Sequence, residues 1–193
     1  MLPGSILDRV RGRRRNNTLA MALLTALFLV LAGCVDQRQP APAELRTSAP
    51  PWDAPRDAIS YIKAGGFDPQ PLDLVDNQHV VQVRISVDGR PVEIPAYVGI
   101  DRLRAVQAVV HTHDTTGAVW LEGRNTAGVT LGQLFTVWGV RFGDGCIGGI
   151  CGRLEVTVDG SMISADPRET RLASATSIEI KAASSAPSAS STP

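Results

Sequence analysis

A strict alternation of apolar and polar residues constrains the fold of this chain more than any other feature. From Val81 to Val87 every second residue is Val or Ile, and the residues between them are Gln, Arg and Ser. Because successive side chains of a strand point to opposite faces of a sheet, this pattern predicts a β-strand with one buried face. Asp88-Gly89 supplies a tight turn into a second strand from Val92 to Tyr97. The sequence therefore predicts a β-hairpin.

The rest of the domain contains further paired strands. Leu154–Gly160 repeats the pattern of Val83–Gly89, and both segments end in Val-Asp-Gly. Val106–Thr112 and Gly117–Glu122 form another expected strand pair, and Ser177–Ala182 is expected to close the sheet. These segments favour a mainly antiparallel sheet built from hairpins.

One helix has clear start and stop signals. Thr130 is a suitable N-cap, and Gln133, three residues on, completes a capping box. From Leu131 to Trp138 the large apolar residues fall at i, i+3, i+4 and i+7, on one face of a helix, and Gly139 follows as a stop. This spacing predicts that Trp138 packs in the core rather than against a ligand.

The fold class expected from these elements is α+β, a mainly antiparallel sheet with one short capped helix packed on it. Arg56–Ala64 is also expected to be helical and to end at Gly65-Gly66.

The N-terminus has the pattern of an export signal. Five arginines within residues 1–15 precede an uncharged run, Leu19–Gly33, which is shorter than the roughly 20 residues needed to span a bilayer. Since the positive charge lies on the N-terminal side, the pattern favours a signal peptide over a permanent anchor.

The uncharged run ends in Leu31-Ala32-Gly33-Cys34, which resembles the lipobox of bacterial lipoproteins. This resemblance implies that residues 1–33 are removed and that Cys34 carries the lipid. The protein would then be exported and anchored to the outer face of the cytoplasmic membrane, in the cell envelope.

Composition divides the rest of the chain. Residues 34–56, rich in Pro and Ala, are expected to form an extended tether, residues 57–182 a single α+β domain, and residues 183–193 a disordered tail of Ser, Ala and Pro.

The charge of the mature chain restricts its partners. Removing residues 1–33 takes five arginines from 19 basic residues and Asp8 from 19 acidic ones, which leaves a net charge of about −4. A mildly acidic protein is poorly suited to binding nucleic acid, so we exclude that partner.

Two histidines lie in the strand pair that Thr115-Thr116 is expected to connect. Cross-strand pairing places His111 opposite Trp120, and it puts His113 and Glu122 on the same face. The opposite face is apolar and is expected to meet the core, whereas the histidine face is expected to be more open. Two imidazoles and a carboxylate on one face can converge on a metal ion.

The run His111-Thr-His113-Asp114-x-x-Gly117, then Glu122, then Thr130-Leu-Gly-x-x-Phe-x-x-Trp-Gly139 resembles a family of small exported bacterial proteins with no assigned activity. The resemblance covers about residues 77–181. In that family another histidine usually stands at the position of Trp120, and three histidines on this face would suit copper or zinc.

The candidate metal ligands in this chain are therefore His111, His113 and Glu122, with Asp114 or His79 as a fourth candidate, and copper or zinc is the candidate metal. Trp120 is expected on the ligand face, where it could stack on His111. A further histidine often accompanies the position near His79 in that family, but His79 on its own indicates a surface position at a strand entry. Histidines that only hydrogen-bond within a polar sheet face remain the alternative.

Cys146 and Cys151 are the two cysteines that remain once Cys34 is committed to lipid. In an oxidising compartment, with Gly148-Gly149 allowing the loop between them to bend, they are expected to form a disulfide. This bond would join the end of the helix to a strand beginning near Arg153.

The chain carries no complete catalytic signature: it lacks G-x-S-x-G, H-E-x-x-H, a phosphate loop and a dinucleotide fingerprint. The leading hypothesis is a non-enzymatic, lipid-anchored envelope protein that binds a transition metal or a small ligand at the His111, His113 and Glu122 face. The alternative is an interaction module that docks another envelope protein, with structural histidines.

Overall fold

The structure is a computed structural model that describes residues 43–74 and 76–185. The predicted signal peptide, Cys34 and the first part of the predicted tether lie outside the described residues, as does most of the predicted tail. Within the described ranges, no helix is long and apolar enough to cross a membrane.

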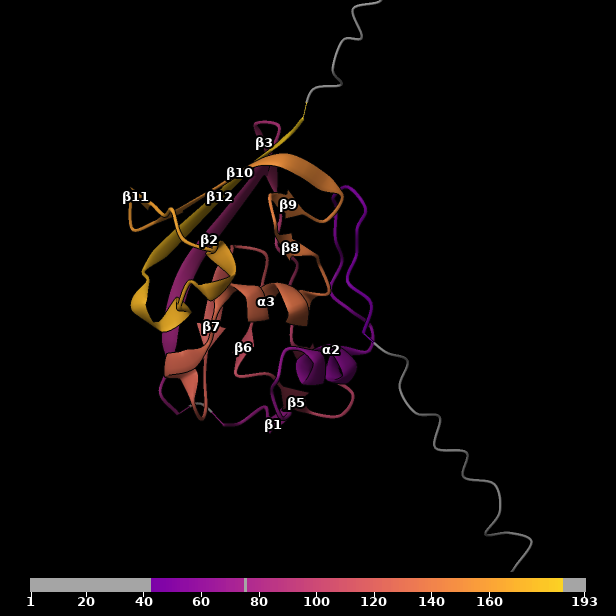
Figure 1. The fold of residues 1–193 in the computed structure, drawn as a ribbon. Coiled ribbons are helices and arrows are strands. Elements are labelled where there is room, and N and C mark those ends of the chain that lie inside the picture. Colours follow the sequence, from indigo (N-terminus) through magenta and orange to yellow (C-terminus); the bar gives the residue numbers. More distant parts are fainter. Residues whose placement is uncertain (1–42, 75, 186–193) are drawn as a thin grey trace, which may run out of the picture. The chain divides into compact units, whose positions relative to one another are not determined.

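The domain is built on a curled sheet of nine strands with the order β6-β7-β2-β12-β10-β9-β8, in which β3 also pairs with β2 and β11 with β10 (Figure 1). Its strands are β2 (His79–Val87), β3 (Arg90–Val92), β6 (Val110–His111), β7 (Ala118–Leu121), β8 (Phe142–Gly143), β9 (Cys146–Ile147), β10 (Ile150–Val158), β11 (Ser161–Met162) and β12 (Ser177–Ser184). A second, antiparallel sheet contains β1 (Gln70–Pro71), β5 (Val106–Gln107) and β4 (Ile100–Asp101).

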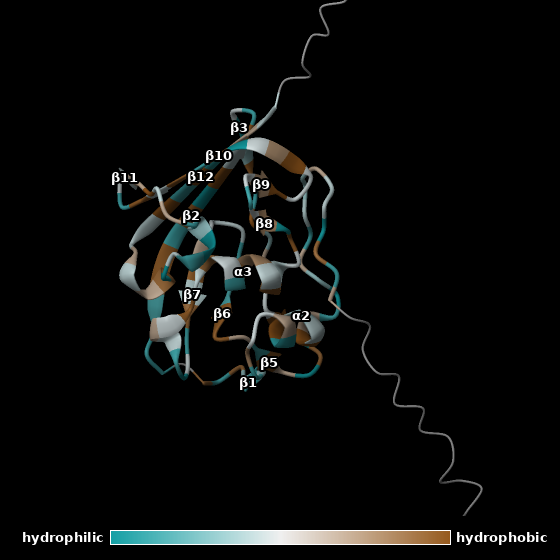
Figure 2. Ribbon diagram, in the orientation of Figure 1, coloured by the Kyte–Doolittle hydropathy of each residue, from teal (hydrophilic) through white to brown (hydrophobic). Residues whose placement is uncertain are grey.

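The apolar–polar alternation in the sequence of β2 matches the burial of its side chains. Its Val and Ile side chains from Val81 to Val87 are buried, and the residues between them are not. Figure 2 shows apolar and hydrophilic residues alternating along the long strands. The second strand of the predicted hairpin is shorter than expected, because β3 ends at Val92 and the segment up to Tyr97 leaves the sheet.

The centre of the sheet differs from the predicted meander of hairpins. Strand β12 lies between β2 and β10, where Ile180 pairs in parallel with Ile85 and in antiparallel with Val156. The α+β class is therefore correct, but the sheet is mixed, and Ser177–Ala182 forms its middle rather than its closing edge. β12 also includes residues 183 and 184, the first two of the predicted tail. Short 3-10 helices, η2 (Pro167–Glu169) and η3 (Leu172–Ser174), lie on the return path that lets β12 enter in the direction of β2.

The predicted strand Val106–Thr112 is divided between the two sheets. Gln107 pairs with Gln70 and Ile100 in the small sheet, whereas Val110 pairs with Leu121 in the large one. The expected pairing with the β7 segment therefore holds only for the second half of the predicted strand.

Two Val-Asp-Gly turns follow β2 and β10, and both of their aspartates bind β12. Asp88 and Asp159 have positive φ angles of 50° and 47°, and the glycines that follow them have 75° and 81°. Two successive positive φ angles are typical of the type I′ turn, which matches the twist of a hairpin. The Asp88 carboxylate accepts a hydrogen bond from Ser184 N–H (2.9 Å), and the Asp159 carboxylate accepts one from Ser177 N–H (2.8 Å). The two Val-Asp-Gly turns therefore hold the two ends of β12 by hydrogen bonds.

We expect Asp159→Asn to lower stability at neutral pH and to have much less effect near pH 2. The hydrogen bond from Ser177 N–H lowers the pKa of Asp159 below its ordinary value of 3.8. Because the native pKa is the lower one, the stabilisation is complete above the ordinary value and is lost as the pH falls through the native value. Urea unfolding of both proteins at each pH measures this difference. An equal loss at both pH values would mean that turn geometry, not charge, is responsible.

Helix α3 (Leu131–Trp138) begins and ends where the sequence predicts. Thr130 Oγ1 accepts a hydrogen bond from Gln133 N–H, and Gln133 Oε1 accepts one from Thr130 N–H, which completes the predicted capping box. Gly139 ends the helix with a φ of 74°, and a Cβ there would lie 2.6 Å from the Tyr61 ring. Glycine is therefore required at this position both by backbone conformation and by space.

Helix α3 forms the centre of the packing. Helix α2 (Ala58–Ala64) lies against it, so the domain contains the second helical stretch as well as the capped helix. Helix α3 also contacts β6 and β8, the two ends of the strand order, and the sheet curls toward it (Figure 1). Trp138 is fully buried, as predicted, and its Nε1–H donates to the Trp52 carbonyl at 3.0 Å.

The domain begins before residue 57, which corrects the end of the predicted tether. Trp52 is only 2% exposed, and its ring lies edge-on to Trp138 with centroids 5.7 Å apart. Arg46 forms a β-bridge with Val140. The Pro/Ala-rich composition of residues 34–56 conceals this role, because one tryptophan docks the segment without any apolar periodicity.

Candidate metal centre

His111, His113 and Glu122 come together at the edge of the sheet. His111 on β6 pairs with Trp120 on β7, which is the register that a Thr115-Thr116 loop predicts. One nitrogen or oxygen atom from each of His111, His113 and Glu122 lies within 4.8 Å of the other two. The opposite face of the strand pair meets the core as predicted. Its fully buried residues are Val110, Thr112, Val119 and Leu121.

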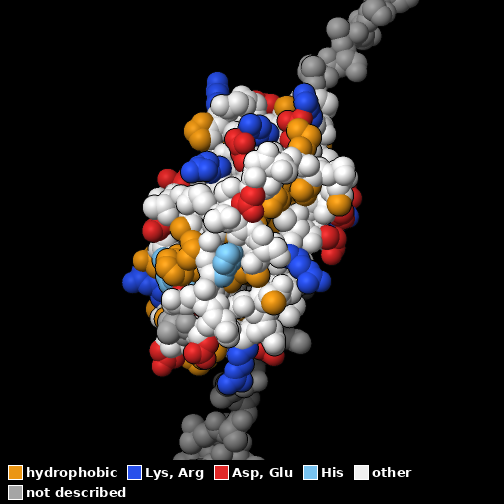
Figure 3. All heavy atoms as spheres, turned by 90° about the vertical axis from the view of Figure 1, so that its left-hand side faces the viewer, with side chains coloured by type: hydrophobic (Ala, Val, Ile, Leu, Met, Phe, Trp, Pro, Cys, Tyr) orange, Lys and Arg blue, Asp and Glu red, His pale blue; other side chains and the backbone are white. Residues whose placement is uncertain are grey.

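The histidine face is more closed than the sequence pattern suggests. His111 is 0% and Glu122 3% exposed, whereas His113 is exposed to solvent. The His113 ring covers His111 edge-on, with centroids 4.8 Å apart, and the chain turns back so that His111 Nδ1 donates to the Ala108 carbonyl at 2.9 Å. Histidine is visible on the face of the molecule in Figure 3, among apolar and uncharged side chains. The cluster thus combines two buried groups with one solvent-facing imidazole.

Glu122 has polar neighbours at both carboxylate oxygens. Gln78 Nε2 donates to Oε1 at 2.8 Å, and Oε2 lies 3.4 Å from His111 Nε2. Within the described ranges, no Lys or Arg side chain forms an ion pair with this carboxylate. No sequence pattern pointed to Gln78, which lies next to Glu122 because His79 pairs with Leu121. Only the register of β2 against β7 could have revealed it, and no local pattern specifies that register.

The hydrogen bond to Ala108 fixes the tautomer of His111. With its proton on Nδ1, the ring presents a lone pair at Nε2, which lies 3.2 Å from His113 Nε2. His113 can donate one proton to that lone pair, but Glu122 Oε2 still faces an acceptor rather than a donor. Two buried acceptors 3.4 Å apart repel each other unless a cation or a proton lies between them. The arrangement can therefore hold a metal ion.

Burial sets the protonation of His111. Loss of hydration lowers the pKa of its imidazole below the ordinary value of 6.5, and it outweighs the hydrogen bond to Ala108 and the charge of Glu122, which both favour the protonated form. Neutral imidazole is the form that binds metal ions.

Asp114 and His79 lie apart from this cluster. The Asp114 carboxylate accepts hydrogen bonds from Thr116 N–H (2.9 Å) and Thr116 Oγ1–H (2.5 Å), and the side-chain bond in particular lowers the pKa of Asp114. His79 Nε2 donates to the Ala175 carbonyl at 2.8 Å. Asp114 therefore shapes the turn, and His79 secures the start of β2.

Trp120 contacts His113 rather than His111, which corrects the expected stacking. The centroids of the Trp120 and His113 rings are 5.3 Å apart, and the rings meet at 77°. The cluster therefore has an indole directly beside its exposed imidazole, where fluorescence can report on a bound ion.

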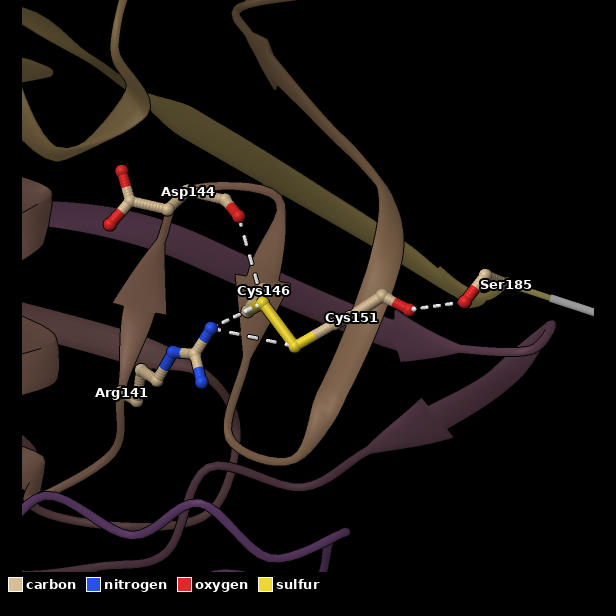
Figure 4. The surroundings of a disulfide bond; sticks show 5 residues. All are labelled: Arg141, Asp144, Cys146, Cys151 and Ser185. Carbon is tan, nitrogen blue, oxygen red and sulfur yellow. Dashed lines mark hydrogen bonds between the residues drawn. A yellow bond between two sulfur atoms is a disulfide. The ribbon is translucent and has the colours of Figure 1, made fainter.

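The expected disulfide between Cys146 and Cys151 is present, with a Cα–Cα distance of 4.1 Å (Figure 4). The two cysteines are cross-strand partners in the β9–β10 hairpin. The bond therefore joins β9 to a strand that begins at Ile150, three residues earlier than expected, and β8 separates it from the end of α3.

No protein-family model, curated protein or solved structure matches this chain. Only the geometry of the cluster and the sequence motifs therefore bear on its function.

Proposed function

We propose that this chain is a lipid-anchored protein of the bacterial cell envelope that binds a divalent transition metal, copper or zinc. Cys34 carries the lipid, and His111, His113 and Glu122 bind the metal. The lipobox Leu31–Cys34 and the arginines before it support the anchor.

The proposed metal site is supported by three ligand atoms, one each from His111, His113 and Glu122, that lie within 4.8 Å of one another. Two imidazole nitrogens and one carboxylate oxygen form a donor set that suits zinc and copper(II). Metal-binding proteins commonly orient their ligands by outer hydrogen bonds, and Ala108 and Gln78 supply these to His111 and Glu122. Since the cluster has three protein ligands and His113 is exposed, a bound ion would complete its coordination from the solvent side.

Elemental analysis after loading with zinc or copper tests this proposal. The full chain with Cys34→Ala is loaded, dialysed without chelator and compared with a variant that also carries His111→Ala and His113→Ala. His79→Gln is the matched control, because His79 lies outside the cluster. We expect one metal ion per chain in the unmodified site and in the control, and an affinity lowered by more than about 100-fold in the double variant, since even outer-shell changes cost 10–100-fold.

Quenching of Trp120 fluorescence during the titration reports binding at the cluster rather than elsewhere on the chain. Circular dichroism confirms that each variant is folded. Failure of the unmodified site to retain metal, or retention of metal by the double variant, would contradict the proposal. It would favour instead an envelope interaction module with structural histidines.

A further inference from the structure

An arginine side chain lies against the disulfide. Arg141 Nη2 donates to Cys146 Sγ at 2.6 Å and lies 3.5 Å from Cys151 Sγ (Figure 4). A disulfide sulfur is an uncharged and weak acceptor, so a guanidinium gains little from it. A thiolate in the same place would form a charge-assisted hydrogen bond. The position of Arg141 therefore favours the reduced, ionised form of Cys146.

No carboxylate competes for this guanidinium among the described residues. Asp144, the acidic residue nearest in sequence, pairs with Arg168 at 3.3 Å. The backbone of Arg141 is also fixed on both sides, because its N–H donates to the Arg46 carbonyl and its carbonyl accepts from Gly148 N–H. The cation is therefore held beside the sulfurs by the sheet and is not neutralised by an acid.

The two sulfurs are unequally accessible. Cys151 is exposed, whereas Cys146 is 4% exposed and lies on the Arg141 side. An external thiolate can therefore reach Cys151, and Cys146 becomes the leaving group. Exchange is faster when the leaving thiolate is stabilised, which is the effect of the neighbouring guanidinium.

The hairpin has its own support without the disulfide. Gly148 N–H donates to the Arg141 carbonyl and Gly149 N–H to the Ser48 carbonyl, while Gly152 N–H donates to the Gly145 carbonyl. The bond closes only a short loop, so it constrains the unfolded chain less than a long-range disulfide would. The two cysteines would therefore stay adjacent after reduction, ready to form the bond again.

We propose that Cys146–Cys151 is an exchangeable disulfide that oxidises an external dithiol in the cell envelope. One thiolate of the dithiol attacks Cys151 Sγ, which forms a mixed disulfide, breaks the Cys146–Cys151 bond and releases the Cys146 thiolate beside Arg141. The second thiol of the partner loses its proton and attacks the partner's own sulfur in the mixed disulfide. This step releases Cys151, which takes up a proton. Two electrons pass to this chain, and the partner leaves as a disulfide.

This activity is independent of the metal centre, because it uses none of the metal ligands. Its test uses the full chain with Cys34→Ala, which leaves Cys146 and Cys151 as the only cysteines. The oxidised protein is equilibrated in mixtures of reduced and oxidised glutathione, free thiols are alkylated, and mass spectrometry counts them. We expect half-reduction at millimolar glutathione with both forms present, whereas a structural disulfide remains oxidised there.

Arg141→Gln isolates the contribution of the guanidinium. We expect the equilibrium constant for reduction by glutathione to fall about tenfold, as it would if the pKa of the Cys146 thiol rose by about one. Arg141→Lys, which keeps the charge, should recover most of this loss, and Arg84→Gln, at an exposed position on β2, serves as the distant control. Circular dichroism verifies the fold of each variant.

A chain that stays fully oxidised in millimolar reduced glutathione would overturn the proposal, and so would a folded Arg141→Gln variant with unchanged equilibrium. If substitution of Arg141 prevents folding, the glutathione equilibrium of the chain with Arg141 intact tests the proposal alone. Half-reduction in the glutathione mixtures supports exchange, and resistance to reduction excludes it.

Discussion

Trp138→Ala is expected to lower the free energy of unfolding by about 4 kcal/mol, because truncating a fully buried tryptophan leaves a cavity that the surroundings fill only in part. Trp138 is 0% exposed, and its ring contacts Trp52 and Phe135. The substitution also removes the Nε1–H donor from the Trp52 carbonyl. Since domains of this size are stable by about 5–15 kcal/mol, this loss is a large part of the total free energy of unfolding.

Urea unfolding followed by circular dichroism measures this loss. Trp138→Phe keeps most of the ring volume and loses the donor, so its expected cost is smaller, about 1–2 kcal/mol. Leu103→Ala is the exposed control, because Leu103 is 98% exposed and its truncation should change little. A loss below about 1 kcal/mol in Trp138→Ala would show that the packing of Trp138 against Trp52 and Phe135 contributes little to the stability of the domain.

The features that the sequence predicted correctly depend on neighbouring residues. The start of α3 follows from Thr130 and Gln133, three residues apart, and its end follows from Gly139. The pairing of His111 with Trp120 follows from the short loop between their strands. In each case the partners are close along the chain, so local stereochemistry decides the geometry.

The features that the sequence could not predict depend on distant segments. Ile180 lies at the centre of the sheet because β12 meets β2, about 95 residues earlier in the chain, and parallel pairing has no turn that marks it in the sequence. Trp52 packs against Trp138 of helix α3, and Gln78 meets Glu122 through the register of β2 against β7. The closure of the histidine face has a local cause instead, because the His113 ring covers His111 and the chain turns back toward Ala108. Period-two spacing does not specify either contact, so the open face expected from periodicity was wrong.

Glu122→Gln separates a metal site from a purely structural histidine cluster, because the two hypotheses predict opposite changes in the stability of the metal-free protein. In the metal-free protein Glu122 Oε2 faces the His111 Nε2 lone pair at 3.4 Å. A glutamine amide would donate to that lone pair in place of His113, while its oxygen keeps the hydrogen bond from Gln78. We therefore expect the metal-free variant to be as stable as the parent or more stable by about 1 kcal/mol.

The same substitution should weaken metal binding by about 100-fold or more, since it removes the anionic ligand and its loss should exceed the 10–100-fold cost of an outer-shell change. Urea unfolding in chelator and titration with zinc or copper measure the two effects on one protein. Glu179→Gln is the matched control, because Glu179 lies on β12 and pairs with Lys181 rather than with the cluster. If the cluster were instead held together by a protonated histidine paired with the carboxylate, removing the charge would destabilise the metal-free protein and leave metal uptake unchanged. Stability that is kept or gained, together with a loss of affinity, indicates a cation site, because there the carboxylate repels the neighbouring lone pair until the ion is bound.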